Sequence, residues 1–225
     1  MTSQVVSKKR IADHGEVFTA EREVNAMLDL VKHETERIES RFLEPACGTG
    51  NFLVPILEKK LNLIKKKYAK SQLEFERHAI IAIGSLYGVD ILEDNVQTCR
   101  ERLGAIFQEM YKALYKKKCK EACLETVKFV LHKNIIWGDA LSLKTVGKNQ
   151  TEIIFSEWAP AMGSLIKRRD YAFSEIIPKD KQKQNGFFAE NNVSDLGTTS
   201  FIPKTIKEFP LTHFLKLANE KSNQL

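Results

Sequence analysis

No stretch of this 225-residue sequence approaches the ~18 consecutive apolar residues that a membrane-spanning helix needs. The first ten residues, MTSQVVSKKR, lack the apolar core of a secretory signal peptide. The four cysteines show neither a disulfide framework nor the ligand spacing of a zinc site, so we expect no metal and a reducing environment. Together these absences predict a cytoplasmic protein without membrane contact.

Charge of one sign is in only modest excess, since 35 basic residues face 29 acidic ones and the net charge is +6. Two lysine clusters, EKKLNLIKKKYAK and YKALYKKKCK, hold much of this excess. They fit a nucleic-acid partner, but the solvated outer face of a helix, the commoner state of helical lysine, explains the same residues. The charge therefore permits a nucleic-acid partner without identifying one.

Three segments predict short strands, and each of them ends in an acidic residue and leads onward to a new element. These segments are residues 41–44, 85–91 and 134–141, and a fourth strand is expected at 151–158. Apolar residues recur at helical spacing between them, in residues 52–68, 73–83, 93–118 and 121–133. An earlier helix is expected to begin at Phe18 and Thr19, with Thr19 as its N-cap. The alternation predicts an α/β fold with a parallel sheet and right-handed crossovers.

The stretch EPACGTGNF joins the first predicted strand to the helix after it. Gly48 and Gly50 carry no Cβ, so the backbone can approach a ligand closely at this turn. A dinucleotide-binding turn would need a third glycine where Leu53 stands, and a phosphate-binding P-loop would need Gly-Lys-Ser/Thr where Asn51 follows Gly50. Glu44, at the end of the strand, would repel phosphate and suits a ligand with a cationic amine.

Two more acids end the second and third predicted strands, Asp90 in GVDI and Asp139 in WGDAL. Asp90 could accept hydrogen bonds from both hydroxyls of a ribose, and Asp139 from an adenine amino group. Because parallel strands end at one edge of a sheet, these acids and Glu44 predict a single ligand crevice. The alternative for each acid is a helix cap, and the three acids with the glycine turn favour the crevice.

Four segments carry a family resemblance, namely HGEVFTAEREVNAMLDL, FLEPACGTGNFLVPIL, LYGVDI and NIIWGDAL. In this order they resemble the S-adenosylmethionine-binding motifs of the adenine-specific DNA methyltransferases of bacterial restriction–modification systems. The resemblance covers roughly residues 14–141 and implies a Rossmann-like methyltransferase fold with S-adenosylmethionine as cofactor. It implies a cofactor site made of Phe18, Thr19, Glu44, Ala46, Gly48, Gly50, Asp90, Ile91, Asp139 and Ala140.

The resemblance also implies a role for the matched residues. Phe18 and Thr19 would close over the methionine end of the cofactor, and Glu44 would face its ammonium group. Ala46 and the two glycines would form the wall of the site. Asp90 would hold the ribose, Ile91 would pack on the adenine, and Asp139 would accept from the adenine amino group.

The resemblance divides the chain into a flexible N-terminus at 1–15, a cofactor-binding methyltransferase domain at 16–160 and an irregular extension at 161–225. This extension is shorter than the family pattern, and we expect a truncated C-terminal half. Its last segment, FPLTHFLKLANEKSNQL, carries apolar residues. They can pack back on the core or dock on a partner chain.

The family places an Asn-Pro-Pro-aromatic quartet directly after its fourth strand. There, two acceptors bind the adenine amino hydrogens while the aromatic ring stacks on the flipped-out base. Here the strand TEIIF is followed by Ser156, Glu157 and Trp158, and the paired prolines are missing. Trp158 could stack, Ser156 could accept one hydrogen bond and Glu157 could replace the Asn, so these are the candidate catalytic residues.

We therefore expect an adenine-specific DNA methyltransferase, or the methyltransferase subunit of a restriction–modification or related defence system. Its partners would be DNA and a specificity or nuclease subunit. The alternative is a catalytically silent subunit that binds cofactor or acts as a scaffold through a partner protein. Methylation of RNA or of a small molecule fits the general fold but not GEVFT and EPACGTGNF together.

Overall fold

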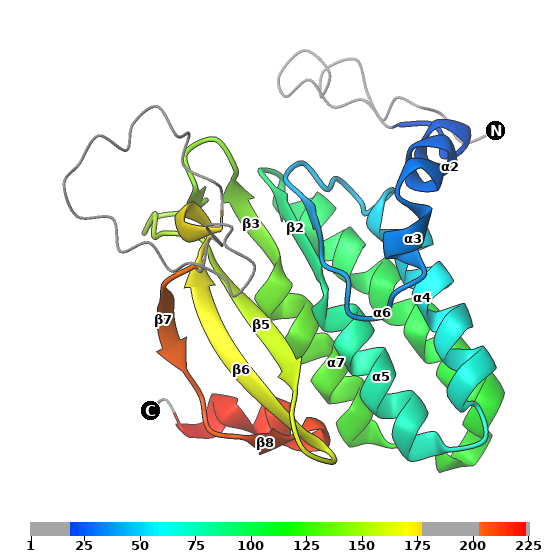
Figure 1. Cartoon of the computed structure of the whole chain (residues 1–225). Helices are drawn as coiled ribbons and strands as arrows, with labels where there is room; N and C mark the ends of the chain where they lie inside the picture. Colours follow the sequence, from blue (N-terminus) through cyan, green and yellow to red (C-terminus); the bar gives the residue numbers. More distant parts are fainter. Residues whose placement is uncertain (1–18, 177–202, 224–225) are drawn as a thin grey trace, which may run out of the picture.

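The computed structural model describes residues 19–176 and 203–223, which form a mixed α/β structure (Figure 1). Its helices are α2 (Glu21–Leu30), α3 (Lys32–Thr35), α4 (Leu53–Tyr68), α5 (Gln72–Gly84), α6 (Glu93–Tyr115) and α7 (Glu121–Asn134). Short 3-10 helices are η1 (Lys116–Lys118), η2 (Phe173–Glu175) and η4 (Phe214–Asn223). None of the helices in these two ranges is long and apolar enough to cross a membrane.

The first sheet contains the three expected parallel strands, β1 (Phe42–Glu44), β2 (Leu86–Asp90) and β3 (Ile135–Asp139), with β2 in the middle. A short strand, β4 (Lys144–Thr145), pairs antiparallel with β3. The register places Glu44 opposite Gly88 and Asp90 opposite Trp137. The acidic ends of the parallel strands therefore lie at one edge of this sheet, as the sequence predicts.

Helices α4 to α7 cover one face of the parallel sheet, as Figure 1 shows. Helix α4 turns a single apolar face inward, on which Leu57, Leu61 and Ile64 are fully buried. The second half of α5, HAIIAIG, is apolar on nearly all sides, because it lies between the sheet and neighbouring helices. Its start is fixed by Ser71, whose hydroxyl accepts a hydrogen bond from the Glu74 N–H at 3.4 Å.

The second sheet is antiparallel and contains β5 (Ile154–Pro160), β6 (Leu165–Ala172), β7 (Thr205–Glu208) and β8 (Thr212–His213). Strand β5 runs opposite to β1–β3, and the arrows of Figure 1 show this direction. The N–H of Ile153 donates to Leu143 O, beyond the end of β3, whereas that of Ser156 donates to the side chain of Asn134, before β3 begins. The fourth expected strand thus exists, but it points away from the acidic edge.

The segment expected to be irregular, 161–225, contains the central strand of this second sheet. Strand β6, LIKRRDYA, pairs with β5, β7 and β8. The sequence hides it because charged residues occupy both of its faces: Arg168 is buried and pairs with Asp170, while Lys167 and Arg169 point the other way. The expected boundary at residue 160 coincides with the last residue of β5.

The C-terminal segment packs on helix α7. Phe214 and Leu217 are fully buried in the main core, and the Thr126 hydroxyl donates to Phe214 O at 3.0 Å. The sequence left two interpretations of this segment open, packing on the core and docking on a partner chain, and these buried residues pack on the core.

Candidate functional site

The turn after β1 adopts a conformation that requires glycine at two positions. Gly48 and Gly50 have φ values of 50° and 90°, in the left-handed region. A Cβ on Gly50 would also lie 2.9 Å from the Sγ of Cys99, closer than side-chain packing allows. The turn therefore brings bare backbone to the carboxyl edge of the parallel sheet.

Asp90 connects this turn to the start of α6. Its Oδ2 accepts a hydrogen bond from the Gly48 N–H at 2.8 Å, and its Oδ1 accepts from the Leu92 N–H at 2.9 Å and the Asn95 side chain at 3.2 Å. A carboxylate oxygen can accept two hydrogen bonds, so Oδ2 retains one acceptor position. Asp90 thus organises the edge and can still bind a hydroxyl group. The helix-cap alternative does not describe Asp90, because Leu92 is the N-cap residue of α6.

Glu44 is a half-buried carboxylate without a basic partner among the residues that the structure describes. Its one polar contact there is the Ala46 N–H, 3.4 Å from Oε1. Burial raises the pKa of Glu44, because desolvation disfavours the charged form. A cationic ligand would supply the missing counter-charge at this position.

Asp139, at the end of β3, stabilises the turn that follows the strand. Its carboxylate accepts from the N–H groups of Leu141 at 2.9 Å and Ser142 at 3.3 Å, and these bonds lower its pKa. Apolar side chains stand exposed beside it, since Ile91 is 50% and Leu141 96% exposed. Ala140, between Asp139 and Leu141, is half-buried. An exposed apolar surface next to hydrogen-bond acceptors can bind a flat heterocycle.

Three residues of this edge were missed by sequence reasoning: Asn95, Arg102 and Trp137. Arg102 of α6 holds the glycine turn, because its Nη1 donates to Thr49 O at 2.7 Å, Thr49 Oγ1 at 3.1 Å and Asn51 Oδ1 at 3.0 Å. The Trp137 indole donates to Ile91 O at 2.9 Å. Only Asn95, five residues after Asp90 in the first turn of a helix, carried a local signal.

The first helix begins later than expected. Helix α2 starts at Glu21, its N-cap is Ala20 rather than Thr19, and no side chain caps it. The Ala20 carbonyl accepts from the N–H groups of Glu23 and Val24, while the Glu23 carboxylate accepts from the Ala20 N–H at 3.4 Å. Thr19 precedes the helix and has no regular secondary structure, and Phe18 lies outside the described residues.

Ser156, Glu157 and Trp158 do not follow β5 but lie within it, beside the amino ends of β2 and β3. Ser156 and Trp158 point into the protein. The Ser156 hydroxyl donates to Asp170 Oδ1 at 2.7 Å, and Trp158 is 5% exposed with its ring edge-on to Phe129 at 5.9 Å. The structure therefore does not bring these three residues to the acidic edge, because β5 runs antiparallel to β1–β3.

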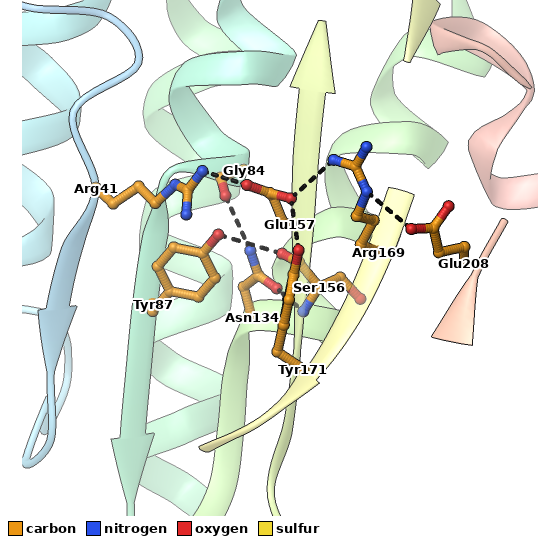
Figure 2. A network of polar contacts seen from close by, with 9 residues as sticks. All are labelled: Arg41, Gly84, Tyr87, Asn134, Ser156, Glu157, Arg169, Tyr171 and Glu208. Carbon is orange, nitrogen blue, oxygen red and sulfur yellow. Dashed lines mark hydrogen bonds and ion pairs between the residues drawn. The ribbon is translucent and has the colours of Figure 1, made fainter. Parts of the chain in front are cut away.

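Glu157 points to the opposite face of β5 and forms the centre of a polar network (Figure 2). It pairs with Arg41 and with Arg169 at 3.3 Å, and it accepts from the Tyr171 hydroxyl at 3.2 Å. The buried side chain of Asn134, the last residue of α7, links the end of α5 to β5. It donates to Gly84 O at 3.0 Å and accepts from the Ser156 N–H at 3.1 Å.

Comparison with known families decides the class of the protein. The model of the MmeI DNA-methyltransferase domain matches residues 18–152, more than half of the chain. The chain belongs to this family. It is a family of restriction–modification DNA methyltransferases, which confirms the broader part of the resemblance.

The MmeI match contains the glycine turn, Asp90 and Asp139, and it ends two residues before β5. The antiparallel sheet thus lies outside the region of family similarity. No curated protein and no solved structure matches the chain.

Proposed function

We propose that the chain binds S-adenosylmethionine at the carboxyl edge of β1–β3, in a Rossmann-like methyltransferase core. We further propose that it serves as an adenine-specific DNA methyltransferase, or as the methyltransferase subunit of a restriction–modification system. The observation that carries the proposal is Asp90, which joins the glycine turn to the next loop through Gly48 and retains an acceptor position. The match to the MmeI DNA-methyltransferase domain supports the same assignment.

The residues at this edge fit the cofactor in charge and shape. The lone carboxylate of Glu44 would face the ammonium group, and the backbone from Ala46 to Gly50 would line the methionine part, with Phe18 and Thr19 closing over it. Asp90 would bind a ribose hydroxyl. Ile91 and the Asp139–Ala140 turn would receive the adenine. The cofactor supplies an activated methyl group when bound, and these residues orient it and exclude water.

Groups other than Ser156, Glu157 and Trp158 would then accept the amino hydrogens of the target adenine in DNA. Those residues are engaged with Asp170, with Arg41 and with the core, at the opposite end of the parallel strands. This observation favours a second candidate function, a catalytically silent subunit that binds the cofactor or acts as a scaffold through a partner protein. DNA is the proposed substrate of the methyltransferase.

Calorimetric titration with S-adenosylmethionine tests the cofactor site. We expect wild type to bind, and Asp90→Ala to bind about 1–3 kcal/mol more weakly, since the ribose hydroxyl loses its acceptor. Asp29→Ala is the matched control, because Asp29 is an exposed acid on α2 that pairs with the side chain of Lys59. Equal affinity of the Asp90 variant and wild type would reject the site.

Transfer of a labelled methyl group to DNA separates the two functions. Incorporation by the chain alone supports a complete methyltransferase. Incorporation only after a partner subunit is added supports a methyltransferase subunit. Cofactor binding without incorporation under either condition supports the silent subunit and contradicts the methyltransferase proposal.

A further inference from the structure

A cavity of about 530 Å³ lies on the face of the parallel sheet opposite to α4–α7. On β2, Leu86 faces the helices and the main core, whereas Tyr87 faces a second, smaller core and this cavity. The cavity extends from β1 and β2 across to β5 and β6. Its volume is in the usual range of about 300–1,000 Å³ for ligand pockets. Among the residues that the structure describes, none of those proposed to bind the cofactor lines it.

Aromatic rings form much of the cavity wall. Tyr87 and Phe155 pack edge to face with their ring centres 5.3 Å apart, and Tyr171 stands beside them on β6. The Tyr87 hydroxyl donates to Ser156 O at 3.3 Å, and burial raises its pKa, so it stays neutral. Such a wall suits a flat apolar ligand, because aromatic rings stack on flat ring systems.

Charged groups gather over this wall. Arg41 and Arg169 approach the Glu157 carboxylate from opposite sides, as Figure 2 shows. Arg41 uses one terminal amino group on Glu157, and Arg169 uses Nη1 on Glu157 and Nε on Glu208. Each guanidinium keeps a terminal amino group that forms no hydrogen bond or ion pair with another residue in the described ranges. The described lining holds two guanidinium groups and the Glu157 carboxylate, whereas Glu208 lies outside it and is shared between Arg169 and Lys167. The charged groups of this lining therefore sum to one positive charge.

We propose that this cavity binds a nucleotide, with its base against the aromatic wall and its phosphate on Arg41 and Arg169. Guanidinium groups match phosphate in charge and in hydrogen-bond geometry, and aromatic side chains bind bases by stacking. Nucleotides combine a flat aromatic base with an anionic phosphate, and they are the units of the DNA on which this family acts. Two ligands present such a base and phosphate: a free mononucleotide and an unpaired nucleotide of a DNA strand. The site is distinct from the proposed cofactor edge and does not depend on it.

Calorimetric titration of the full chain tests the site with three probes: deoxyadenosine monophosphate, deoxyadenosine, and a single-stranded oligodeoxyadenylate of about ten nucleotides. We expect the monophosphate to bind, and deoxyadenosine to bind at least about tenfold more weakly, because it lacks the phosphate. Tighter binding of the oligonucleotide would identify a DNA strand as the source. Binding of the monophosphate alone would identify the free nucleotide.

Arg41→Met should weaken binding of the monophosphate roughly ten- to a hundredfold, through loss of charge-assisted hydrogen bonds. Glu157 stays paired with Arg169 and Tyr171 in this variant. Arg37→Met is the matched control, because Arg37 is 67% exposed and paired with an acid, as Arg41 is at 63%. If Arg41→Met does not fold, Thr205→Phe tests the site instead. The larger side chain fills the cavity from β7 and leaves the charged groups in place, so nucleotide binding should be lost.

Two results would overturn the proposal. One is that no probe binds, or that the Arg41 and Thr205 variants bind as wild type does. The other is that S-adenosylmethionine displaces the nucleotide and Asp90→Ala abolishes its binding, which would place the nucleotide at the cofactor edge. Failure of cofactor binding with nucleotide binding intact would refute the proposed function and leave this site standing.

Discussion

The parallel and antiparallel sheets differ in whether their charged side chains have partners. At the edge of the parallel sheet, Glu44 has no basic partner among the described residues, and Asp90 keeps an acceptor position. In the antiparallel sheet, charged side chains pair with one another, as in Arg168 with Asp170 and Arg169 with Glu157. The family match covers the first region and ends before the second. The difference indicates that the proposed cofactor site and the paired charges of β5 and β6 belong to separate parts of one chain.

Removing a core residue of the antiparallel sheet gives the largest effect. We expect Trp158→Ala to lower the free energy of unfolding by about 3–5 kcal/mol, because it empties the space between β5 and Gly84 of α5. Urea unfolding measures this loss. Met162→Ala, on the exposed turn after β5, should change stability by less than about 0.5 kcal/mol. Loss of cofactor binding in folded Trp158→Ala would contradict the separation of the two regions.

The link that Asn134 makes between the end of α5 and β5 is the next target. Asn134→Ala should cost about 1–3 kcal/mol of stability, because Gly84 O and the Ser156 N–H are left unpaired in the interior. Hydrogen exchange should show faster exchange at Ser156, and calorimetric titration should show nearly unchanged cofactor affinity. Asn149→Ala, at an exposed position, is the control. Unchanged exchange at Ser156 would show that Asn134 does not hold β5 to the helices.

Loosening the glycine turn tests the parallel region alone. Arg102→Met removes three hydrogen bonds to Thr49 and Asn51, and we expect roughly tenfold weaker binding of S-adenosylmethionine. Nucleotide binding at the Arg41 cavity should stay the same. Arg22→Met, on the exposed side of α2, should leave both affinities unchanged. A loss of nucleotide affinity in Arg102→Met would show that the nucleotide and the cofactor do not bind at separate sites.

Buried Lys60 gives the smallest effect, a pH dependence of stability. Its amino group donates to Ile38 O at 3.0 Å and to the Ser85 hydroxyl, and burial lowers its pKa from 10.5 to about 7. The unfolded chain binds more protons between these values, so stability should rise as the pH increases from 7 towards 10.5. The slope is at most about 1.4 kcal/mol per pH unit.

Urea unfolding at pH 7 and 8 measures this slope, and Lys60→Met should reduce it. An exposed lysine of the same helix supplies the control, since Lys66→Met should keep the slope of wild type. Equal slopes in all three proteins would refute the assignment to Lys60.

Much of the parallel region could be predicted from the sequence, because its signals are local. Helix α4 was expected at 52–68 and spans Leu53–Tyr68, and β2 was expected at 85–91 and spans Leu86–Asp90. Apolar spacing and the acid at a strand end each involve only a few neighbouring residues. Strand β6 could not be predicted in this way, because Arg168 is buried through its pair with Asp170 and its stacking on Phe209.

The direction of β5 also had no local signal in the strand. A parallel return needs a crossover of about a dozen residues or more, usually a helix. Between β3 and β5 the chain forms only β4 and turns, so it reverses instead. This reversal is the physical reason that Ser156 and Trp158 lie far from the edge where the sequence placed them.

The glycine turn and the acids at the ends of three strands could be found from residue type and order, and they indicate the methyltransferase family. Which groups share a site depends on the tertiary structure. Glu157 joins Arg41 and Arg169 across 116 and 12 residues of chain, respectively, to form one wall of a cavity. Such contacts depend on the direction of β5 and on packing between sheets, and no local pattern encodes either.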